Sequence, residues 1–495
     1  MKAAVRLLGG WSKPKRPSPT MEEAAENREA IVYRYVRAGF PLLVLVSGAG
    51  ALVVEASLTT VTLSTLIILL FLVVFIWPAT AAYLIIGLTP LIAGIDRGVL
   101  VPLLRPNEVL DLLLGGAVVT RAVLQLTQGR FRWPYFTRLD MSILLMAVTS
   151  SILPLAWMAI RSKTIESDDL LYAIGLWKLY GVYILVRWSV RSDKEIRRCI
   201  WVSMAAACVV GMISVLQSLN LFGVPSLLAD YYSSYGNVEA VLSGRVGSTV
   251  GLPIAMADFM ILNLALAVGC LLQGWSPRGL LVAVTFVFAL ATLLSGEVSA
   301  AVGLLLAVFV IGWVTYRPRV TLSLVLVTLA TLPFLRSVIS QRLEGFQGAS
   351  SLPLSWIGRL DNLRTYFWPH LFSDYQFVLG VRPSARVVVP SQATGYVWIE
   401  SGYTWLLWSG GIPFLLSFLY FLRMGLGTTL AAARQNGGPV SVVALGATVG
   451  LVVIAVLMTV DIHLTYRGSA DLFFSLLALT ISGRHGEGLS RAVSE

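Results

Sequence analysis

The sequence contains little charge and few of the residues that build metal sites or disulfide frameworks. Only 13% of its 495 residues are charged, 57% are hydrophobic, and the mean hydropathy is +0.79. This composition excludes an ordinary soluble globular domain. The chain has three histidines and three cysteines, Cys199, Cys208 and Cys270. Because these cysteines fall at or within apolar segments or on one side of them, we expect neither disulfides nor a thiolate metal site. No cofactor is expected either.

Motifs of common soluble enzymes are also missing. We find no Walker loop, dinucleotide fingerprint, zinc-ligand spacing or nucleophile elbow in a plausible context. Residues 1–38 lack the apolar core of a cleavable signal peptide and are expected to form a basic cytoplasmic tail. The net charge of +11 is explained by basic loops attracted to anionic lipid, so no nucleic-acid partner is expected.

Long apolar runs fill the rest of the chain. Segments such as 252–273 and 298–315 have the roughly 17 to 25 apolar residues that cross about 30 Å as a helix. Because they lack the alternation of a membrane β-barrel, the sequence predicts an all-α polytopic membrane protein. We expect about fourteen transmembrane helices, within a range of roughly 12 to 14. Their centres are predicted near residues 47, 68, 87, 116, 150, 179, 208, 262, 287, 306, 328, 409, 450 and 475.

Basic residues are unevenly divided between alternate loops. With the N-terminus inside, one set of loops holds most of the 37 Lys and Arg residues, including those of 187–198 and 317–319. Cytoplasmic loops carry the excess of positive charge, so both termini are predicted to be cytoplasmic. Two loops on the opposite side are unusually long: an outer loop over residues 220–250 and a large extracytoplasmic loop over residues 336–398.

These loops set the predicted organisation of the chain. A transmembrane bundle covers residues 39–335, C-terminal transmembrane helices cover 399–483, and a second cytoplasmic tail covers 484–495. The large loop is rich in aromatic residues and therefore expected to be functional rather than disordered. It contains a helical stripe that predicts an amphipathic helix on the membrane surface, which Pro369 should end or kink. The stripe consists of Trp356, Leu360, Leu363, Phe367 and Leu371.

The outer loops are unusual in their cations, nearly all of which are arginine. The planar guanidinium binds phosphate through two parallel hydrogen bonds, and cations are disfavoured on this side, so the pattern favours anion binding. Two plainer interpretations stay open. The chain prefers arginine over lysine throughout, and arginines of an interfacial helix can simply reach toward lipid headgroups.

Glu400 stands at the head of the apolar run Tyr396 to Phe421, next to Trp398 and Tyr403. A carboxylate beside aromatic surface can have its pKa raised by desolvation, which suits a general base. The alternative is a carboxylate that favours the positive end of a helix dipole, which is also the expected role of Glu297. Arg121 and Lys178 lie within predicted spans, and Asp258 is their expected acidic partner; a path through these three would indicate a transporter.

Three short motifs resemble the superfamily of O-antigen ligases and Wzy-type polysaccharide polymerases. "GRVGSTVGLPIAMADF" supplies an arginine before a Gly-Ser-Thr turn and a proline that starts a helix. "LLSGEVSAAVGLLL" keeps the serine of a second motif but lacks its usual arginine. The third comprises Arg359 to Trp368, then "FVLGVRP", then "IESGYTWLLWSGGIP". There Glu400 stands where ligases commonly have histidine and Ser401 replaces the usual asparagine, which favours a polymerase.

The resemblance implies a GT-C-like bundle in the bacterial plasma membrane, with an active site on the extracytoplasmic face. It implies a metal-independent, inverting glycosyltransferase that uses undecaprenyl-pyrophosphate-linked oligosaccharide as donor and acceptor, with a chain-length regulator as a further partner. Glu400, Arg245 and Arg359 are then the expected catalytic residues, with the two arginines on the pyrophosphate. Alternatives are ligase-type transfer to a lipid or protein acceptor, and a lipid-linked glycan transporter. The expected substrate-binding residues are Arg364, Arg382, Arg386, Trp368, Tyr403 and His370.

Overall fold

The computed structural model describes residues 58–98, 104–129, 135–232, 241, 245–335, 340, 354–390, 395–435 and 437–494. The chain divides into two units, Met1–Ile76 and Trp77–Glu495. In the first unit the described residues form the helix α2 (Leu58–Ile76). The predicted span near residue 47 and the tail over residues 1–38 lie outside the described residues.

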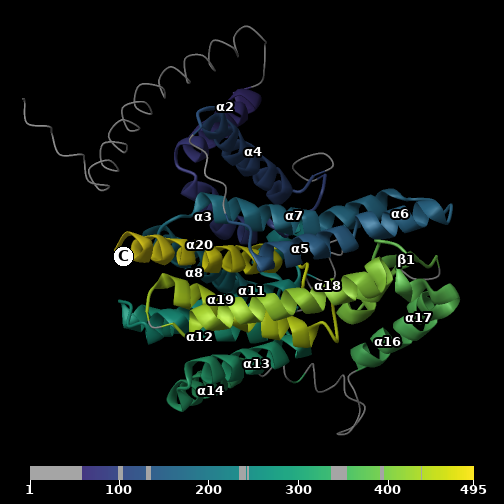
Figure 1. Ribbon diagram of the computed structural model, residues 1–495. Helices are drawn as coiled ribbons and strands as arrows, with labels where there is room; N and C mark the ends of the chain where they lie inside the picture. The colour runs from purple at the N-terminus through teal and green to yellow at the C-terminus, as the bar shows by residue number, and fades with distance from the viewer. Residues whose placement is uncertain are drawn as a thin grey trace, which may run out of the picture. The chain divides into compact units, whose positions relative to one another are not determined.

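The second unit is mostly helical (Figure 1). Its described elements before the large loop are α3 (Ala79–Ile92), α4 (Pro106–Thr127), α5 (Arg138–Thr149), α6 (Ile152–Ile160), α7 (Ser167–Ser189), α8 (Asp193–Ser218), α9 (Val224–Tyr232), η2 (Ser248–Val250), α11 (Pro253–Leu272), α12 (Arg278–Leu294), α13 (Val298–Thr315), α14 (Pro318–Thr331) and η3 (Leu332–Leu335). The remaining elements are α16 (Leu354–Asn362), η4 (Leu363–Phe367), α17 (Trp368–Phe372), η5 (Ser373–Val378), β1 (Arg386–Val388), β2 (Tyr396–Trp398), α18 (Gly402–Ala433), α19 (Pro439–Leu457) and α20 (Ser469–Ser494).

The prediction of an all-α polytopic membrane protein agrees with these helices. Eight described helical segments are long and apolar enough to cross a membrane, and five more apolar helices among the described residues are shorter. Every predicted span centre except the one near residue 47 falls within one of these segments. The short hairpin of β1 and β2, paired antiparallel with Arg386 opposite Trp398, was not predicted.

Local sequence explains where several helices begin. Ser192 caps α8 by accepting the backbone N–H of Glu195 at 3.3 Å, and Ser401 caps α18 by accepting that of Thr404 at 3.4 Å. A proline occupies the first turn of α4, α11, α14 and α19, where its missing N–H is not needed. These signals fix the polar ends of otherwise uniformly apolar helices.

The core lies around α11 and α19, which are the most deeply buried of the candidate spans. In Figure 1 both run through the middle of the bundle, between α8 and α20 on one side and α12 and α13 on the other. Glycines let neighbouring helices approach closely, as Gly450 of α19 does against Phe473 of α20. α18 is interrupted at Gly411, where φ is +66°, and η5 packs against this break.

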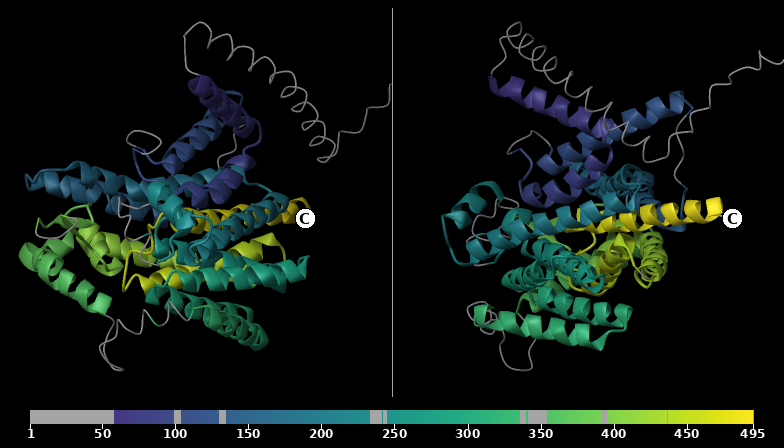
Figure 2. Two further views of the ribbon diagram at one scale, coloured as in Figure 1. Left: turned by 180° about the vertical axis from the view of Figure 1, so that it is seen from behind. Right: turned by 90° about the vertical axis from the view of Figure 1, so that its left-hand side faces the viewer.

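Hydrogen bonds join loops within each of two groups in the second unit. In one group, Arg161 donates to the carbonyl of Val381 at 3.2 Å, and the backbone N–H of Gly94 donates to the carbonyl of Thr249 at 2.9 Å. In the other, Gln273 donates to the hydroxyl of Ser441 at 2.9 Å. The first group includes α16, α17 and the β-hairpin, which lie together at one end of the bundle (Figures 1 and 2). We call this the loop end.

The predicted amphipathic stripe is helical. Leu363, Phe367 and Leu371 are buried against the bundle, as the period predicts. Helical structure continues to Phe372, so Pro369 does not end it, but the regular α-helix is interrupted directly before the proline, which agrees with the alternative prediction of a kink. A single π-helical segment, η4, directly precedes α17, so that the proline falls in the first turn of a new helix, where no N–H is required.

Candidate functional site

Arg359 and Glu400, two predicted catalytic residues far apart in the sequence, form an ion pair at the loop end. The distance from Arg359 Nε to Glu400 Oε1 is 3.5 Å. The same guanidinium lies 3.5 Å from Asp461 Oδ2 and donates to the carbonyl of Val460 at 3.1 Å. Arg359 comes from α16, Glu400 precedes α18, and Asp461 lies in the loop between α19 and α20. Three separate parts of the chain therefore meet at one guanidinium.

The electrostatics of this ion pair differ for its two partners. Burial raises the pKa of Glu400; Asp461 raises it further, and the opposing charge of Arg359 does not cancel these effects. Burial alone would lower the pKa of Arg359, but Asp461 and Glu400 outweigh it and raise that pKa. Arg359 therefore stays charged, while Glu400 takes up a proton more readily than an ordinary glutamate.

Arg245, the third predicted catalytic residue, joins the same cluster through Glu297. Arg245 Nη1 lies 3.4 Å from Glu297 Oε1, and 48% of the Arg245 side chain is exposed. Glu297 occupies the N-cap position of α13, at the positive end of the helix dipole as expected, but its side chain makes no capping hydrogen bond. Its charge helps to raise the pKa of both Arg359 and Glu400. We call Arg245, Glu297, Arg359, Glu400 and Asp461 the arginine–carboxylate cluster.

A buried histidine adjoins the arginine–carboxylate cluster. His463 is 2% exposed, and its Nδ1 lies 2.8 Å from Asp258 Oδ2 of α11. Its Nε2 is buried and has no hydrogen-bond partner among the described residues. Burial opposes the charge on His463, but Asp258 and Asp461 outweigh it and raise the pKa. Asp258 is therefore engaged by His463, and it is not the intramembrane partner that the sequence analysis expected for Lys178.

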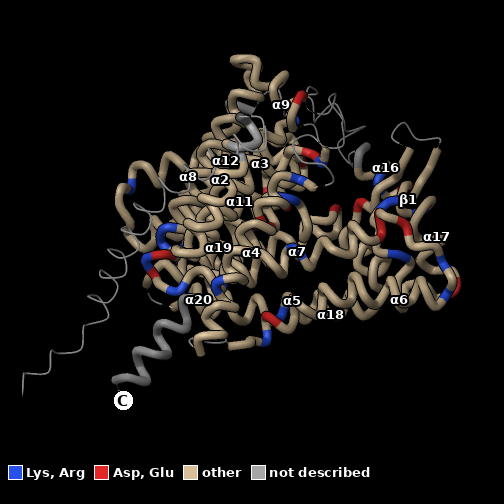
Figure 3. The backbone as a smooth tube through the Cα atoms, turned by 90° about the horizontal axis from the view of Figure 1, so that it is seen from above, with Lys and Arg blue, Asp and Glu red and all other residues tan. Residues whose placement is uncertain are grey.

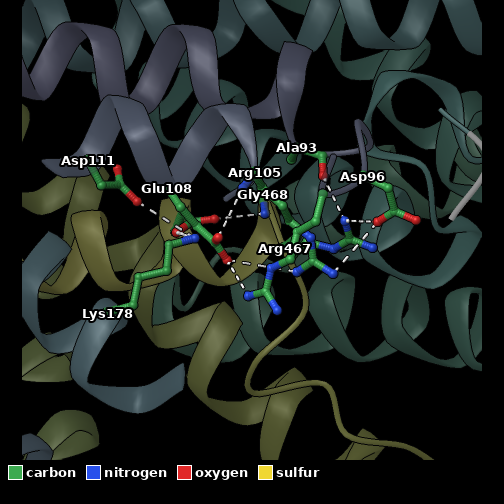
Figure 4. A network of polar contacts seen from close by, with 10 residues as sticks. Ala93, Asp96, Arg105, Glu108, Asp111, Lys178, Arg467 and Gly468 are labelled. Carbon is green, nitrogen blue, oxygen red and sulfur yellow. Dashed lines mark hydrogen bonds and ion pairs between the residues drawn. The ribbon is translucent and has the colours of Figure 1, made fainter. Parts of the chain in front are cut away.

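Lys178 instead belongs to a second polar network, shown in Figure 4. Its Nζ lies 3.2 Å from Asp471 Oδ1 of α20 and 3.7 Å from Asp111 Oδ2 of α4. Asp471 also accepts the backbone N–H of Gly468 at 2.9 Å. A lysine inside a bundle is costly unless it is paired, and here two carboxylates face it.

The same network extends to the loop between α3 and α4. Arg467 lies 3.2 Å from Asp96 and donates to the carbonyl of Ala93 at 3.2 Å, and Arg97 bonds Glu108 at 2.9 Å (Figure 4 labels all of these except Arg97). Positive and negative charges are equal in number, which fits a structural network. The cations are Arg97, Arg105, Lys178 and Arg467, and the carboxylates are Asp96, Glu108, Asp111 and Asp471.

Arg382 and Arg386 bind carboxylates of α7 rather than those of the arginine–carboxylate cluster. Arg382 makes two bonds to Asp169, at 2.9 and 2.6 Å, and the Asp169 side chain is fully buried. Arg386 pairs with Asp168 and stacks over the Tyr396 ring at 4.1 Å. Hydrogen bonding to Asp169 raises the pKa of Arg382. These two arginines connect the large loop to α7, and Figure 3 shows the charged positions gathered beside β1 and α17.

The other predicted binding residues divide between exposed and packed positions. Arg364 and His370 are exposed to solvent on the helical part of the large loop. Trp368 Nε1 donates to the hydroxyl of Thr404 at 3.4 Å, and the Tyr403 hydroxyl donates to the carbonyl of Ala455 at 2.7 Å. Trp368 and Tyr403 therefore connect the loop, α18 and α19, whereas Arg364 and His370 can still meet a ligand.

Sequence reasoning missed the importance of Asp461 and His463. Both lie in the loop between α19 and α20, "MTVDIHLTYRG". The signal available was a concentration of ionisable residues in a short connection between two apolar helices. Among the described residues, no group of three or more His, Cys, Asp or Glu side chains is placed to hold a metal ion.

Comparisons with protein-family models, with curated proteins and with solved structures find no match to this chain.

Proposed function

We propose that the chain is a membrane glycosyltransferase that transfers glycan from an undecaprenyl-pyrophosphate-linked oligosaccharide, and that it lengthens polysaccharide repeat units. The observation that carries the proposal is the meeting of Arg359, Glu400 and Asp461 at the loop end, with Arg245 nearby. Arg359, whose guanidinium suits a diphosphate, thus lies beside a carboxyl with a raised pKa, and Arg245 pairs with Glu297 of the same cluster.

The reaction uses these groups in a single displacement. The oxygen of the acceptor hydroxyl attacks the anomeric carbon of the donor, and Glu400 takes the proton from that hydroxyl at the same time. The bond from that carbon to the phosphate oxygen breaks, and the leaving lipid diphosphate keeps the electron pair. Arg245, half exposed, and Arg359 stabilise the negative charge that develops on it. Attack opposite the leaving group inverts the configuration.

Ligase-type transfer to a lipid or protein acceptor uses the same donor and the same cluster, so only the acceptor distinguishes it. A lipid-linked glycan transporter is less well supported. Lys178 pairs with Asp111 and Asp471, while Asp258 pairs with His463, so these intramembrane charges belong to two separate sites.

The test is a polymerisation assay with purified protein and short lipid-linked repeat units. We expect the wild type to give a ladder of products, and both Arg245→Ala and Arg359→Ala to lose at least about a hundredfold in rate. Arg319→Ala, an exposed arginine of α14, is the matched control and should keep the wild-type ladder. Normal ladders from both cluster variants would exclude this site as the reaction centre.

A further inference from the structure

Apart from the arginine–carboxylate cluster, a cavity of about 370 Å³ opens between α5, α18 and α20. Its volume lies within the range of about 300 to 1,000 Å³ that is usual for small-molecule sites. Arg423 lies on the part of α18 that follows the break at Gly411, so the cavity is separated from the loop end by this break. The lining includes Thr137, Arg138, Arg423, Thr428 and Ile481.

The cavity carries positive charge that no described carboxylate neutralises. Arg138 and Arg423 are exposed, and neither forms an ion pair within the part of the chain that the structure describes. The nearest acidic residue along α5, Asp140, is already paired with Arg187 and accepts the hydroxyl of Tyr183 at 2.7 Å.

The cavity lies where α5 begins and where the apolar segment of α20 ends. Arg138 begins the candidate span Arg138–Ile160, and Ile481 is next to the end of the apolar segment Ser469–Ser482 of α20. Tyr135, just before α5, is 73% exposed, and Phe136 is exposed beside it. Exposed aromatic residues at the end of a span are typical of the level at which acyl chains meet lipid headgroups.

We propose that this cavity binds the phosphodiester headgroup of an anionic phospholipid. Arg138 and Arg423 bind the phosphate oxygens, and the lipid's acyl chains follow the apolar lining contributed by Leu139 and Met424. Basic pockets between transmembrane helices recognise such headgroups in this way. A zwitterionic lipid binds less well because its own cation meets the two arginines. The assignment does not depend on the proposed reaction.

The test is native mass spectrometry of the full-length protein released from vesicles that contain phosphatidylglycerol and phosphatidylcholine in equal amounts. We expect the wild type to retain phosphatidylglycerol, and Arg138→Gln/Arg423→Gln to retain it about thirtyfold less well, from the contribution of two arginines near a membrane surface. Arg317→Gln/Arg319→Gln removes the same charge from exposed arginines at the start of α14 and should match the wild type.

Equal retention by the two double variants would overturn the assignment, because the effect would then reflect overall charge. Equal binding of phosphatidylcholine by the wild type would overturn it as well. Displacement of the lipid by millimolar inorganic phosphate would assign the cavity to a soluble anion instead. If the double variant does not fold, Arg423→Gln alone should lower retention about fivefold, and unchanged retention in that variant would equally reject the site.

Discussion

Glu400 combines two properties that seldom occur together in a carboxylate. It is ion-paired with Arg359 at 3.5 Å, and its pKa is nevertheless raised, because burial and the neighbouring Asp461 and Glu297 outweigh that pair. A carboxylate held only for structure gains nothing from neighbouring negative charge. The arrangement is understandable if Glu400 must bind and release a proton.

Replacing Glu400 by glutamine should therefore affect turnover more than donor binding. Glu400→Gln keeps the size of the side chain but removes its ability to take up a proton, so kcat should fall about 10² to 10⁴-fold while KM for the donor changes little. The measurement is the initial rate of product-ladder formation over a range of donor concentrations. A variant with normal kcat would assign the base to another group.

His463 gives a pH-dependent prediction that is independent of activity. Its pKa is raised in the folded protein, so the imidazolium form is favoured by folding, with Asp258, Asp461, Arg359 and Tyr466 facing it. This stabilisation is present below the unfolded pKa of about 6.5 and is lost as pH rises through the higher folded value. The difference in Tm between wild type and His463→Gln should therefore shrink as pH increases above about 6.5. A difference that grows with pH would contradict the charged pair.

The titration of His463 can also be observed directly. The chain has only three histidines, so histidine-labelled protein in lipid gives three imidazole signals, which His370→Gln and His485→Gln assign by elimination. The His463 signal should titrate at a higher pH than an unperturbed imidazole, whose pKa is about 6.5. An Asp258→Asn variant should move it back toward lower pH, because the carboxylate that stabilises the imidazolium is gone.

At the scale of elements, the large loop is connected to the bundle by paired charges. Arg382 holds fully buried Asp169 of α7 with two hydrogen bonds. Arg382→Ala leaves that carboxylate without its cation and should lower the free energy of unfolding by on the order of 3 kcal/mol. Arg364→Ala, which removes an exposed arginine from the same loop, should change stability little. Thermal unfolding of the two variants in detergent distinguishes the loss of the loop's anchor from the loss of one positive charge. Equal stability of the two variants would show that the Arg382 pair contributes little.

The break in α18 gives a second prediction at this scale. Gly411 has φ +66°, and a Cβ there would lie 2.4 Å from the carbonyl oxygen of Val378. Gly411→Ala should therefore destabilise the protein by at least about 1 to 3 kcal/mol, from backbone strain and displacement of η5. Gly427→Ala in the same helix has open space around its added methyl group and should be neutral or slightly stabilising. A drop in Tm confined to the first variant is the expected result.

The helices and the large loop show which parts of the fold could be predicted from the sequence and which could not. Apolar length predicted the positions of the apolar helices because each helix depends on its own composition, and a helical period predicted the burial of Leu363, Phe367 and Leu371. The pairing of Arg382 with Asp169 could not be predicted, since it joins residues 213 positions apart. Nor could the β-hairpin or the π-helical segment before Pro369, which depend on how the loop packs rather than on local periodicity.

For the whole molecule, the sequence named some of the residues that meet at the loop end but not the residues that surround them. Arg245, Arg359 and Glu400 were expected to act together, and one cluster contains all three. The residues that complete the cluster, Asp461 and Glu297, were only members of a longer group of outer carboxylates. Charge and hydropathy predict at which end of a bundle a residue lies. Which of the residues at that end contact one another depends on how the helices pack.

The separation of the two loop groups makes the orientation of the molecule testable. If the loop end is extracytoplasmic, His370→Cys should react with a membrane-impermeant maleimide in intact cells, while Arg319→Cys should react only after permeabilisation, because both positions are exposed but belong to opposite groups. Cys199 and Cys270 are buried, so Cys208→Ala leaves a background with little reactivity of its own. Labelling in the reverse order would place the arginine–carboxylate cluster on the cytoplasmic side, where a diphosphate-linked donor presented outside could not reach it. Labelling of both positions from one side would contradict the grouping of the loops itself.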